Sequence, residues 1–246
     1  MATARLKNNM TAPYLLDSMH KNIFPDVELA LTEPDGLLAV GGDLSVERLV
    51  AAYQQGIFPW YSEEQPILWW SPDPRMILEP QEIKISRSLA KKIRQQTFTV
   101  TMDKEFQKVI VECSKPRLEK GAAQNETWIL DEMIEAYIKL HKAGYAHSVE
   151  CWQDNKLVGG LYGVAIGQVF FGESMFSRVS DSSKIAFVTL SKQLQQRGFK
   201  LIDCQVYTSH LESLGAKMIS RKNFIKLLKK YTPLSAANNN WQIENE

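Results

Sequence analysis

Two segments decide the fold, Leu157-Val-Gly-Gly-Leu-Tyr-Gly-Val164 and Val169-Phe-Phe-Gly-Glu-Ser-Met-Phe176. Both are rich in apolar, β-branched and aromatic residues, and Ile166-Gly167 between them has the composition of a turn. A third such segment, His147-Ser-Val-Glu-Cys-Trp152, precedes them across the turn Gln153-Asp-Asn-Lys156. Strands this close in the chain pair with one another, so the centre of the protein is predicted to be an antiparallel meander.

Helices flank this meander in the sequence. Asp131–Gly144 has acids in its first turn, Lys and His in its last turn and a closing Gly, which is typical of a helix. A second helix is expected to begin at Ser182 or Ser183 and to end before Gly198. With the strand Phe199–Val206 that follows, these elements predict an α+β fold whose sheet is mostly antiparallel.

The first part of the chain differs in composition, because it is dense in Pro, Gly and Trp. Glu33-Pro-Asp-Gly36 is a turn sequence. Between Gly56 and Arg75 lie four Pro and three Trp, which favour a rigid, irregular, aromatic surface over a regular element. Residues 1–74 are therefore expected to form a small N-terminal domain, and residues 75–246 the main domain.

The bulk properties exclude several classes of protein. The chain has 246 residues and a net charge of +1, so any contact with nucleic acid must come from a local patch. There is no apolar run of about 18 residues, which a membrane span needs, and no apolar signal core at the N-terminus. Cys113, Cys151 and Cys204 are far apart and flanked by apolar residues, which predicts reduced, buried thiols in the cytoplasm.

Several kinds of catalytic chemistry also lack their motifs. We find no glycine loop of the kinds that hold nucleotide phosphates, and no Gly-x-Ser-x-Gly around a nucleophilic serine. His20, His141, His147 and His210 do not have metal-ligand spacing, so no metal site is expected from them. His147, in an alternating strand, is interpreted as a structural residue.

Three polar residues remain on apolar strands. In Leu201-Ile-Asp-Cys-Gln-Val206, alternation places Asp203 and Gln205 on one side and Ile202 and Cys204 on the other. A carboxylate and an amide would then face a polar cleft. Glu173, between Gly and Ser-Met-Phe, is open to two interpretations. It could cap a turn or pair with a neighbouring Arg, or it could line an apolar pocket and hold an ammonium group.

A basic stripe lies on the helix expected from Ser86 to about Gln96. Arg87, Lys91 and Arg94 recur at i, i+4 and i+7, and no acid interrupts the segment. This pattern favours a phosphate-binding surface over an ordinary solvated face. A second basic stripe occurs late in the chain, at Lys222, Lys226 and Lys229.

Six motifs, in this order, resemble those of bacterial leucyl/phenylalanyl-tRNA–protein transferases. Together they cover nearly the whole chain and are specific as a set. The motifs are Leu37-Leu-Ala-Val-Gly-Gly-Asp-Leu44, Tyr53-Gln-Gln-Gly-Ile-Phe-Pro-Trp60, Ile67-Leu-Trp-Trp-Ser-Pro-Asp-Pro-Arg75, Ala146-His-Ser-Val-Glu150, Gly172-Glu-Ser-Met-Phe-Ser-Arg178 and Leu201-Ile-Asp-Cys-Gln-Val206. The resemblance implies a small N-terminal domain beside an acetyltransferase-like catalytic domain. It implies transfer of Leu, Phe or less often Met from aminoacyl-tRNA to proteins that begin with Arg or Lys, which marks them for degradation.

The resemblance also implies roles for individual residues. Asp203 and Gln205 match the catalytic pair, and Glu173 matches the residue that holds the donor's α-amino group. The pocket for the terminal adenosine and the aminoacyl group is expected to comprise Tyr53, Trp60, Trp128, Tyr137, Leu161, Phe170, Met175 and Leu190. The tRNA-binding helix is expected to present Arg87, Lys91 and Arg94. The enzyme is expected to act as a monomer in the cytoplasm, without a membrane, metal or acetyl-CoA.

Aminolysis of an ester needs a neutral amine, a stabilised oxyanion and a proton path to the leaving oxygen. Our hypothesis is that Asp203 orients Gln205, whose carbonyl oxygen accepts a hydrogen bond from the attacking amine. Three alternatives stay open at this point: an acetyl-CoA-dependent N-acetyltransferase, an RNA-binding protein without catalysis, and a peptidoglycan-bridge aminoacyltransferase. The first lacks its pyrophosphate loop in this sequence, the second leaves the three polar residues unexplained, and the third commonly has a helical arm.

Overall fold

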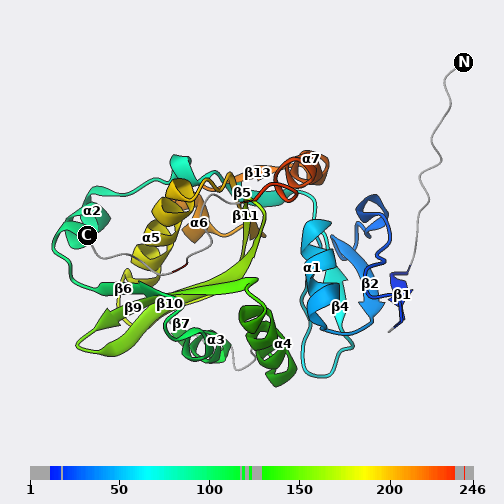
Figure 1. The fold of residues 1–246 in the computed structure, drawn as a ribbon, viewed down its shortest axis with the longest axis horizontal. Coiled ribbons are helices and arrows are strands. Elements are labelled where there is room, and N and C mark those ends of the chain that lie inside the picture. The colour runs from blue at the N-terminus through cyan, green and yellow to red at the C-terminus, as the bar shows by residue number, and fades with distance from the viewer. Residues whose placement is uncertain are drawn as a thin grey trace, which may run out of the picture.

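A computed structural model describes residues 12–17, 19–116, 118–119, 122–123, 129–235 and 241, and the structural statements below concern these residues. Its centre is a seven-stranded sheet in the order β13-β5-β12-β11-β10-β9-β6 (Figure 1). All neighbouring strands in this sheet are antiparallel except β11 and β12, which are parallel. The predicted α+β class and the mostly antiparallel sheet are confirmed.

The large sheet and its helices occupy the chain from Arg75 onward. The strands are β5 (Arg75–Leu78), β6 (Thr99–Met102), β9 (Ala146–Gln153), β10 (Lys156–Ile166), β11 (Val169–Ser177), β12 (Leu201–Gln205) and β13 (Lys217–Ile219). The helices are α2 (Arg87–Arg94), α3 (Phe106–Ser114), α4 (Asp131–Lys142), α5 (Ser182–Gln196), α6 (Ser209–Ser213) and α7 (Arg221–Tyr231). A 3-10 turn, η2 (Pro80–Glu82), and a small hairpin, β7 (Leu118–Glu119) with β8 (Ala122–Ala123), complete this part. The predicted meander is β9-β10-β11.

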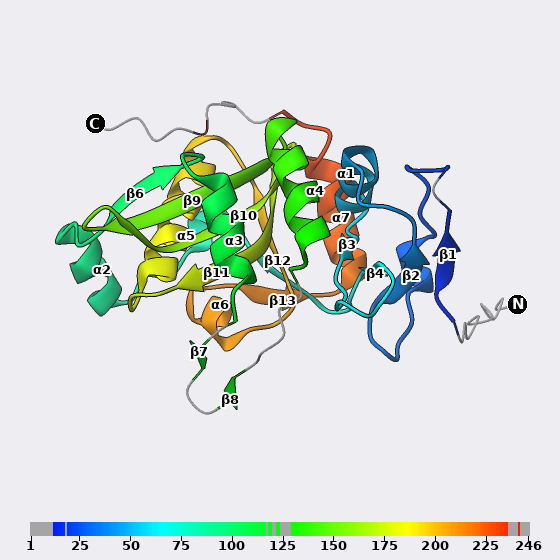
Figure 2. The same ribbon diagram turned by 90° about the horizontal axis from the view of Figure 1, so that it is seen from below.

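Helices cover both faces of the large sheet. Figures 1 and 2 show α3 and α4 on one face and α5 on the other. The alternation predicted for β12 is confirmed, because Leu201 belongs to the core on the α4 side, whereas Ile202 and Cys204 belong to the core on the α5 side. The thiols of Cys113, Cys151 and Cys204 are free and buried, as expected. No helix in the described residues is long and apolar enough to cross a membrane.

A second, four-stranded sheet occupies the first part of the chain. Its order is β1-β2-β4-β3, made of β1 (Tyr14–Leu16), β2 (Leu37–Gly41), β4 (Leu68–Trp70) and β3 (Phe58–Pro59). The 3-10 turn η1 (Val27–Leu29) and the helix α1 (Val46–Gln54) accompany it. The expectation of an irregular surface between Gly56 and Arg75 was wrong, because β3 and β4 lie in this stretch. The prolines do not prevent this sheet, because Pro59 lies on an edge strand and Pro66 and Pro72 lie outside the strands.

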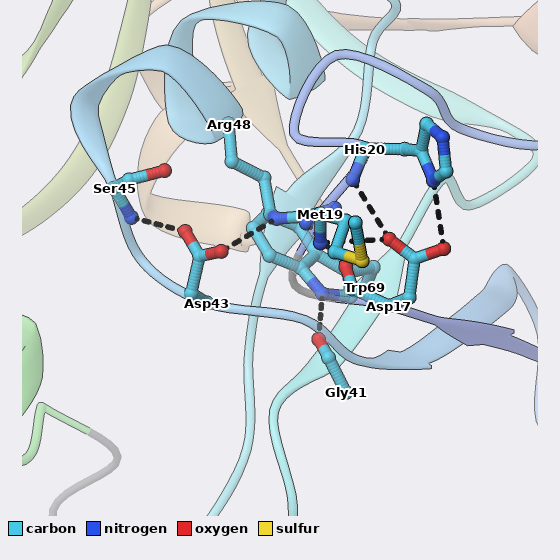
Figure 3. Close-up of polar contacts among 8 residues, drawn as sticks. All are labelled: Asp17, Met19, His20, Gly41, Asp43, Ser45, Arg48 and Trp69. Carbon is cyan, nitrogen blue, oxygen red and sulfur yellow. Dashed lines mark hydrogen bonds and ion pairs between the residues drawn. The ribbon is translucent and has the colours of Figure 1, made fainter.

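A buried arginine on α1 ties this sheet to the segment after β1 (Figure 3). The Nη2 of Arg48 donates to the carbonyl oxygen of Asp17 at 2.5 Å, and its Nε lies 3.5 Å from Oδ2 of Asp43. The carboxylate of Asp17 accepts the backbone N–H groups of Met19 and His20 at 2.9 and 2.7 Å. The α1 helix therefore holds a loop that has few apolar contacts of its own.

Buried residues from both sheets form one continuous core. Tyr53 and Trp69 from the first part belong to the same cluster as Tyr137, Phe171 and Phe224 from the second. The two sheets lie on opposite sides of Pro74 in the sequence, yet they share this apolar interior. Their junction is close-packed around α1, α4 and α7.

Candidate active site

A cavity opens where the parallel strands β11 and β12 separate. They pair only from Val169 and Leu201 to Phe171 and Asp203, although both strands continue beyond these residues. The cavity that begins there has a volume of about 870 Å³. Its walls come from β10, β11, β12 and α5, and Trp60 lies on its wall as well. A cleft next to β12 was predicted from the sequence, and the structure has a cavity there that Asp203 and Gln205 line, although most of its wall is apolar.

Glu173, on β11, is one of the carboxylates that line this cavity. Its Oε2 accepts the hydroxyl of Tyr137 at 2.8 Å, and its Oε1 accepts the side-chain Nε2 of Gln205 at 2.8 Å. The hydroxyls of Tyr137 and Tyr53 are hydrogen-bonded in turn. Burial raises the pKa of Glu173 to about 7, and the nearby Asp203 carboxylate adds to this shift, whereas the hydrogen bonds from the tyrosines and Gln205 oppose it.

The alternative role for Glu173, pairing with a neighbouring arginine, is not seen. Arg178 donates from Nε and Nη2 to Oε2 of Glu112 at 3.0 and 2.9 Å. Glu173 therefore has hydrogen-bond donors without a cationic partner among the described side chains. A buried carboxylate of this kind is a site for a ligand's positive charge.

Asp203 is wholly buried and forms a two-pronged ion pair. Arg75 donates from Nε to Oδ1 at 2.8 Å and from Nη2 to Oδ2 at 2.7 Å. The guanidinium of Arg75 lies between the rings of Phe58 and Phe224, 4.6 and 4.8 Å from their centroids. The pair is thus fixed in place by packing and by hydrogen bonds, and it belongs to the frame of the site.

Gln205 departs from the regular strand. Its φ is +62°, in the left-handed region, and the register with β5 shifts between Asp203 and Gln205. The backbone N–H of Gln205 donates to Oδ1 of Asp203 at 2.9 Å. The orientation hypothesis therefore needs a correction: Asp203 holds the backbone of Gln205, and Glu173 receives its side-chain N–H.

The apolar residues expected at the donor pocket come together on the cavity wall. Leu161, Phe170, Met175 and Leu190 all line it. Trp60 also lines it and is 45% exposed, with its ring 5.7 Å from that of Trp70.

Two of the other aromatic candidates lie away from the cavity wall. Tyr53 and Tyr137 are fully buried and contribute their hydroxyls to the chain that ends at Glu173, instead of facing the cavity. Trp128 lies outside the described residues.

Two residues of the site were not predicted. Arg75 was quoted in a motif without a role, although a charged residue at the start of an apolar run is a signal that it needs a buried partner. Tyr162 lines the cavity, and its hydroxyl is buried without a hydrogen-bond partner in the described part of the chain. In the sequence it is one aromatic residue of a strand, which gave no reason to select it.

The basic stripe on α2 is exposed as predicted. Arg87, Lys91 and Arg94 are all exposed, and none of the ion pairs formed within the described ranges involves them. Their neighbour Lys92 instead pairs with Asp181 at 2.6 Å. Figures 1 and 2 show α2 at the opposite end of the molecule from β1.

Comparison with known proteins identifies the family of this chain. The family model of leucyl/phenylalanyl-tRNA protein transferases matches residues 77–229, and the model of the N-terminal domain of these transferases matches residues 42–73. The chain belongs to the leucyl/phenylalanyl-tRNA–protein transferase family. The family resemblance inferred from the six motifs is confirmed, and this is a family of aminoacyltransferases.

Two relatives show how far the similarity extends. The leucyl/phenylalanyl-tRNA–protein transferase of Hydrogenovibrio crunogenus is 56% identical over 94% of this chain and 89% of the relative. That of Nitrosomonas eutropha is 57% identical over 90% of this chain and 93% of the relative. Among solved structures, L-PGS from Bacillus licheniformis has a TM-score of 0.40 and 11% identity, covering 71% of this chain and 57% of that one.

Proposed function

We propose that this protein transfers Leu, Phe and less often Met from aminoacyl-tRNA to the N-terminal α-amine of proteins that begin with Arg or Lys, which marks them for degradation. One observation carries the proposal: the buried carboxylate of Glu173 and the amide of Gln205 meet at 2.8 Å on the wall of a largely apolar cavity. Membership of a leucyl/phenylalanyl-tRNA–protein transferase family supports the choice of donor.

Glu173 is the residue that would bind the donor's α-ammonium group. A positive charge beside it stabilises the ionised carboxylate, so binding of the donor lowers the pKa that burial has raised. The donor's side chain then lies against Leu161, Phe170, Met175 and Leu190, which line the same cavity. An apolar wall without a charge favours Leu, Phe and Met over polar side chains.

Trp60, whose ring is partly exposed, would stack on the terminal adenosine of the tRNA. Stacking of one base on an aromatic ring contributes about 1–3 kcal/mol. The exposed Arg87, Lys91 and Arg94 of α2 supply phosphate contacts farther along the tRNA, which makes binding sensitive to salt. Both contacts are independent of the tRNA's sequence.

The chemistry is attack of a neutral α-amine on the ester carbonyl, followed by departure of the ribose oxygen, which takes up a proton. Because the Nε2 of Gln205 is bound to Glu173, its carbonyl oxygen is the end that remains to accept a hydrogen bond from the amine. An amide is a weak base, so Gln205 acts by orienting the amine. Asp203 and Arg75 hold the backbone that presents Gln205.

The same proposal includes the organisation expected from the resemblance. Residues 1–74 are a small N-terminal domain and residues 75–246 an acetyltransferase-like catalytic domain. The enzyme acts as a monomer in the cytoplasm on aminoacyl-tRNA and acceptor proteins.

The decisive experiment measures transfer of radiolabelled Leu from Leu-tRNA to a protein that begins with Arg. The same protein beginning with Ala is the acceptor control, and acetyl-CoA is the alternative donor. Incorporation from Leu-tRNA on the Arg protein alone supports the proposal. Acetyl transfer, or binding of tRNA without transfer, contradicts it.

A second arm tests the residues. Gln205→Ala is expected to abolish most transfer while binding of aminoacyl-tRNA, measured by filter binding, stays unchanged. Glu173→Gln is expected to weaken the advantage of Leu-tRNA over uncharged tRNA, because the ammonium group loses its partner. If Gln205→Ala weakened tRNA binding as much as transfer, its role in orienting the amine would be wrong.

A further inference from the structure

A cluster of two histidines and an aspartate lies apart from the cavity. His141 is in the last turn of α4, His147 is in β9, and Asp103 directly follows β6. One possible ligand atom from each side chain lies within 4.8 Å of the other two, and none of the three residues lines the cavity. Their sequence spacing gave no sign of this, because the turn after α4 and the pairing of β6 with β9 bring them together.

Backbone carbonyls fix the orientation of both imidazole rings. Nδ1 of His141 lies 2.8 Å from the carbonyl oxygen of Ala146, and Nε2 of His147 lies 3.2 Å from that of Gly144. A carbonyl oxygen only accepts, so each of these nitrogens donates its proton. With these nitrogens bound to carbonyls, Nε2 of His141 and Nδ1 of His147 are the ring atoms left to contact an ion, as in histidine ligands whose other nitrogen is bound to a carbonyl.

The aspartate is anchored by one oxygen and presents the other. Oδ1 of Asp103 accepts the backbone N–H of Ser148 at 2.8 Å, and Oδ2 lies 2.7 Å from Nδ1 of His147. A cation bound between these two atoms would replace the direct contact between them.

Aromatic rings hold the two imidazoles rigidly. Phe106 stacks on His141 with centroids 4.3 Å apart and planes at 3°, and Trp241 stacks on His147 at 3.7 Å and 9°. His147 is 6% exposed, whereas the side chain of Asp103 is 16% exposed, which leaves access for an ion and a water molecule. Rigid ligands lose little entropy when an ion binds.

We propose that Asp103, His141 and His147 bind a divalent first-row transition-metal ion, with Zn²⁺ the expected occupant. Two imidazole nitrogens and one carboxylate oxygen suit zinc, whereas magnesium and calcium take oxygen ligands. Water completes the coordination. The site is structural, because none of its three residues lines the cavity at which transfer is proposed.

An ion here would bear on the catalytic residues through α4. Tyr137 precedes His141 by one helical turn, on the same side of α4, and donates its hydroxyl to Glu173. A bound ion would link His141 to β9 and to the residue after β6. This link would restrict the motion of the end of α4 and therefore of Tyr137. This last step rests on the proposed function, whereas binding of the ion does not.

The test is a titration of the chelator-treated full-length protein with Co²⁺, followed by the visible absorption bands of the bound ion. One equivalent is expected to bind, and Zn²⁺ is expected to displace it. Asp103→Asn and His147→Gln are each expected to weaken binding by about tenfold or more. His20→Gln is the matched control, because His20 forms an exposed pair with Asp17 at 2.9 Å.

Melting with Zn²⁺ gives a readout that does not depend on transfer. Saturating Zn²⁺ is expected to raise the melting temperature of the wild type and of His20→Gln by more than that of Asp103→Asn, which keeps an oxygen for the N–H of Ser148. An equal rise in the melting temperature of Asp103→Asn would contradict the proposed metal site. Binding of Co²⁺ by the wild type no tighter than by His147→Gln would contradict it as well. If the wild type bound the metal but transferred no amino acid, the proposed function would be contradicted and the metal site would stand.

Discussion

Glu173 is a carboxyl group kept from water, and its pKa of about 7 links the stability of the protein to pH. In an unfolded chain a glutamate releases its proton at a pKa of about 4.3. Between these values the folded protein keeps a proton that the unfolded chain has lost, so the free energy of unfolding falls as pH rises. The loss is complete above the folded pKa and amounts to about 3–4 kcal/mol.

Glu173→Gln removes this dependence, because the amide cannot ionise. Relative to the wild type, the variant is expected to gain about 3–4 kcal/mol of unfolding free energy between about pH 4 and pH 8. Denaturant unfolding at both pH values measures the change. Glu135→Gln, an exposed site on α4, is the control and should show no such trend. A difference between Glu173→Gln and the wild type that stays constant with pH would contradict the assigned cause.

Gln205 is held in a left-handed conformation at the site where chemistry is proposed. Replacing it by Ala or by Gly removes the same amide, but only Ala keeps a Cβ in this strained region. Gln205→Gly is therefore expected to be more stable than Gln205→Ala by about 1 kcal/mol, while both lose transfer. Urea unfolding and a transfer assay on the two variants separate strain from function. Greater stability of the Ala variant would show that φ at this position relaxes.

The pair of Arg75 and Asp203 is expected to matter most when only one partner is removed. Arg75→Met leaves a buried carboxylate without its cation and should cost about 3–5 kcal/mol of unfolding free energy. The double variant Arg75→Met with Asp203→Asn should regain part of that loss, because no unpaired charge remains. Equal destabilisation in the single and double variants would mean that the packing of Arg75 between Phe58 and Phe224 dominates.

Among the elements, α2 is expected to carry the salt dependence of tRNA binding. Changing Arg87, Lys91 and Arg94 together to Gln should weaken aminoacyl-tRNA binding and reduce the slope of affinity against salt by up to about 3. The matched control changes the three lysines of α7, which are equally exposed: Lys222, Lys226 and Lys229. Filter binding at several salt concentrations compares them. The assignment fails if the α7 variant loses as much affinity as the α2 variant.

The elements also show what a single sequence can and cannot tell. The meander and α4 were predictable because their signals are local: alternation, turn residues and charges at helix ends. The α3 helix was missed, although its buried residues Phe106, Val109, Ile110 and Cys113 have helical spacing. The strand Leu68–Trp70 was missed because nearby prolines outweighed a short apolar run.

The site divides in the same way. The polar character of Asp203, Gln205 and Glu173 on apolar strands could be predicted, because it depends only on neighbours in the sequence. The partner of each group could not, since Arg75 pairs with Asp203 across 128 positions and Tyr137 with Glu173 across 36. The left-handed turn at Gln205 has no local signature of the kind a glycine gives. The meeting of His141, His147 and Asp103 likewise depends on the fold.

At the scale of the whole molecule, the shared core predicts that the two sheets unfold together. The ring of Phe224, on α7, contacts the guanidinium of Arg75. A Cβ added at Gly56 would lie 3.1 Å from the same ring. The α7 helix therefore packs against both parts of the chain. Leu194, by contrast, lies in the core on the α5 side. If the molecule is one cooperative unit, a cavity at Leu194 must destabilise the small sheet as well.

Leu194→Ala should therefore lower the free energy of opening by about 2–5 kcal/mol in β10 and by the same amount in β2. Hydrogen exchange followed by mass spectrometry reports both segments in one experiment. Phe224→Ala, at the junction, is the positive control and should affect both in either case. Faster exchange in β10 with unchanged exchange in β2 would mean that residues 1–74 fold as an independent unit, and that the apolar contact across Pro74 joins two domains without coupling their stability.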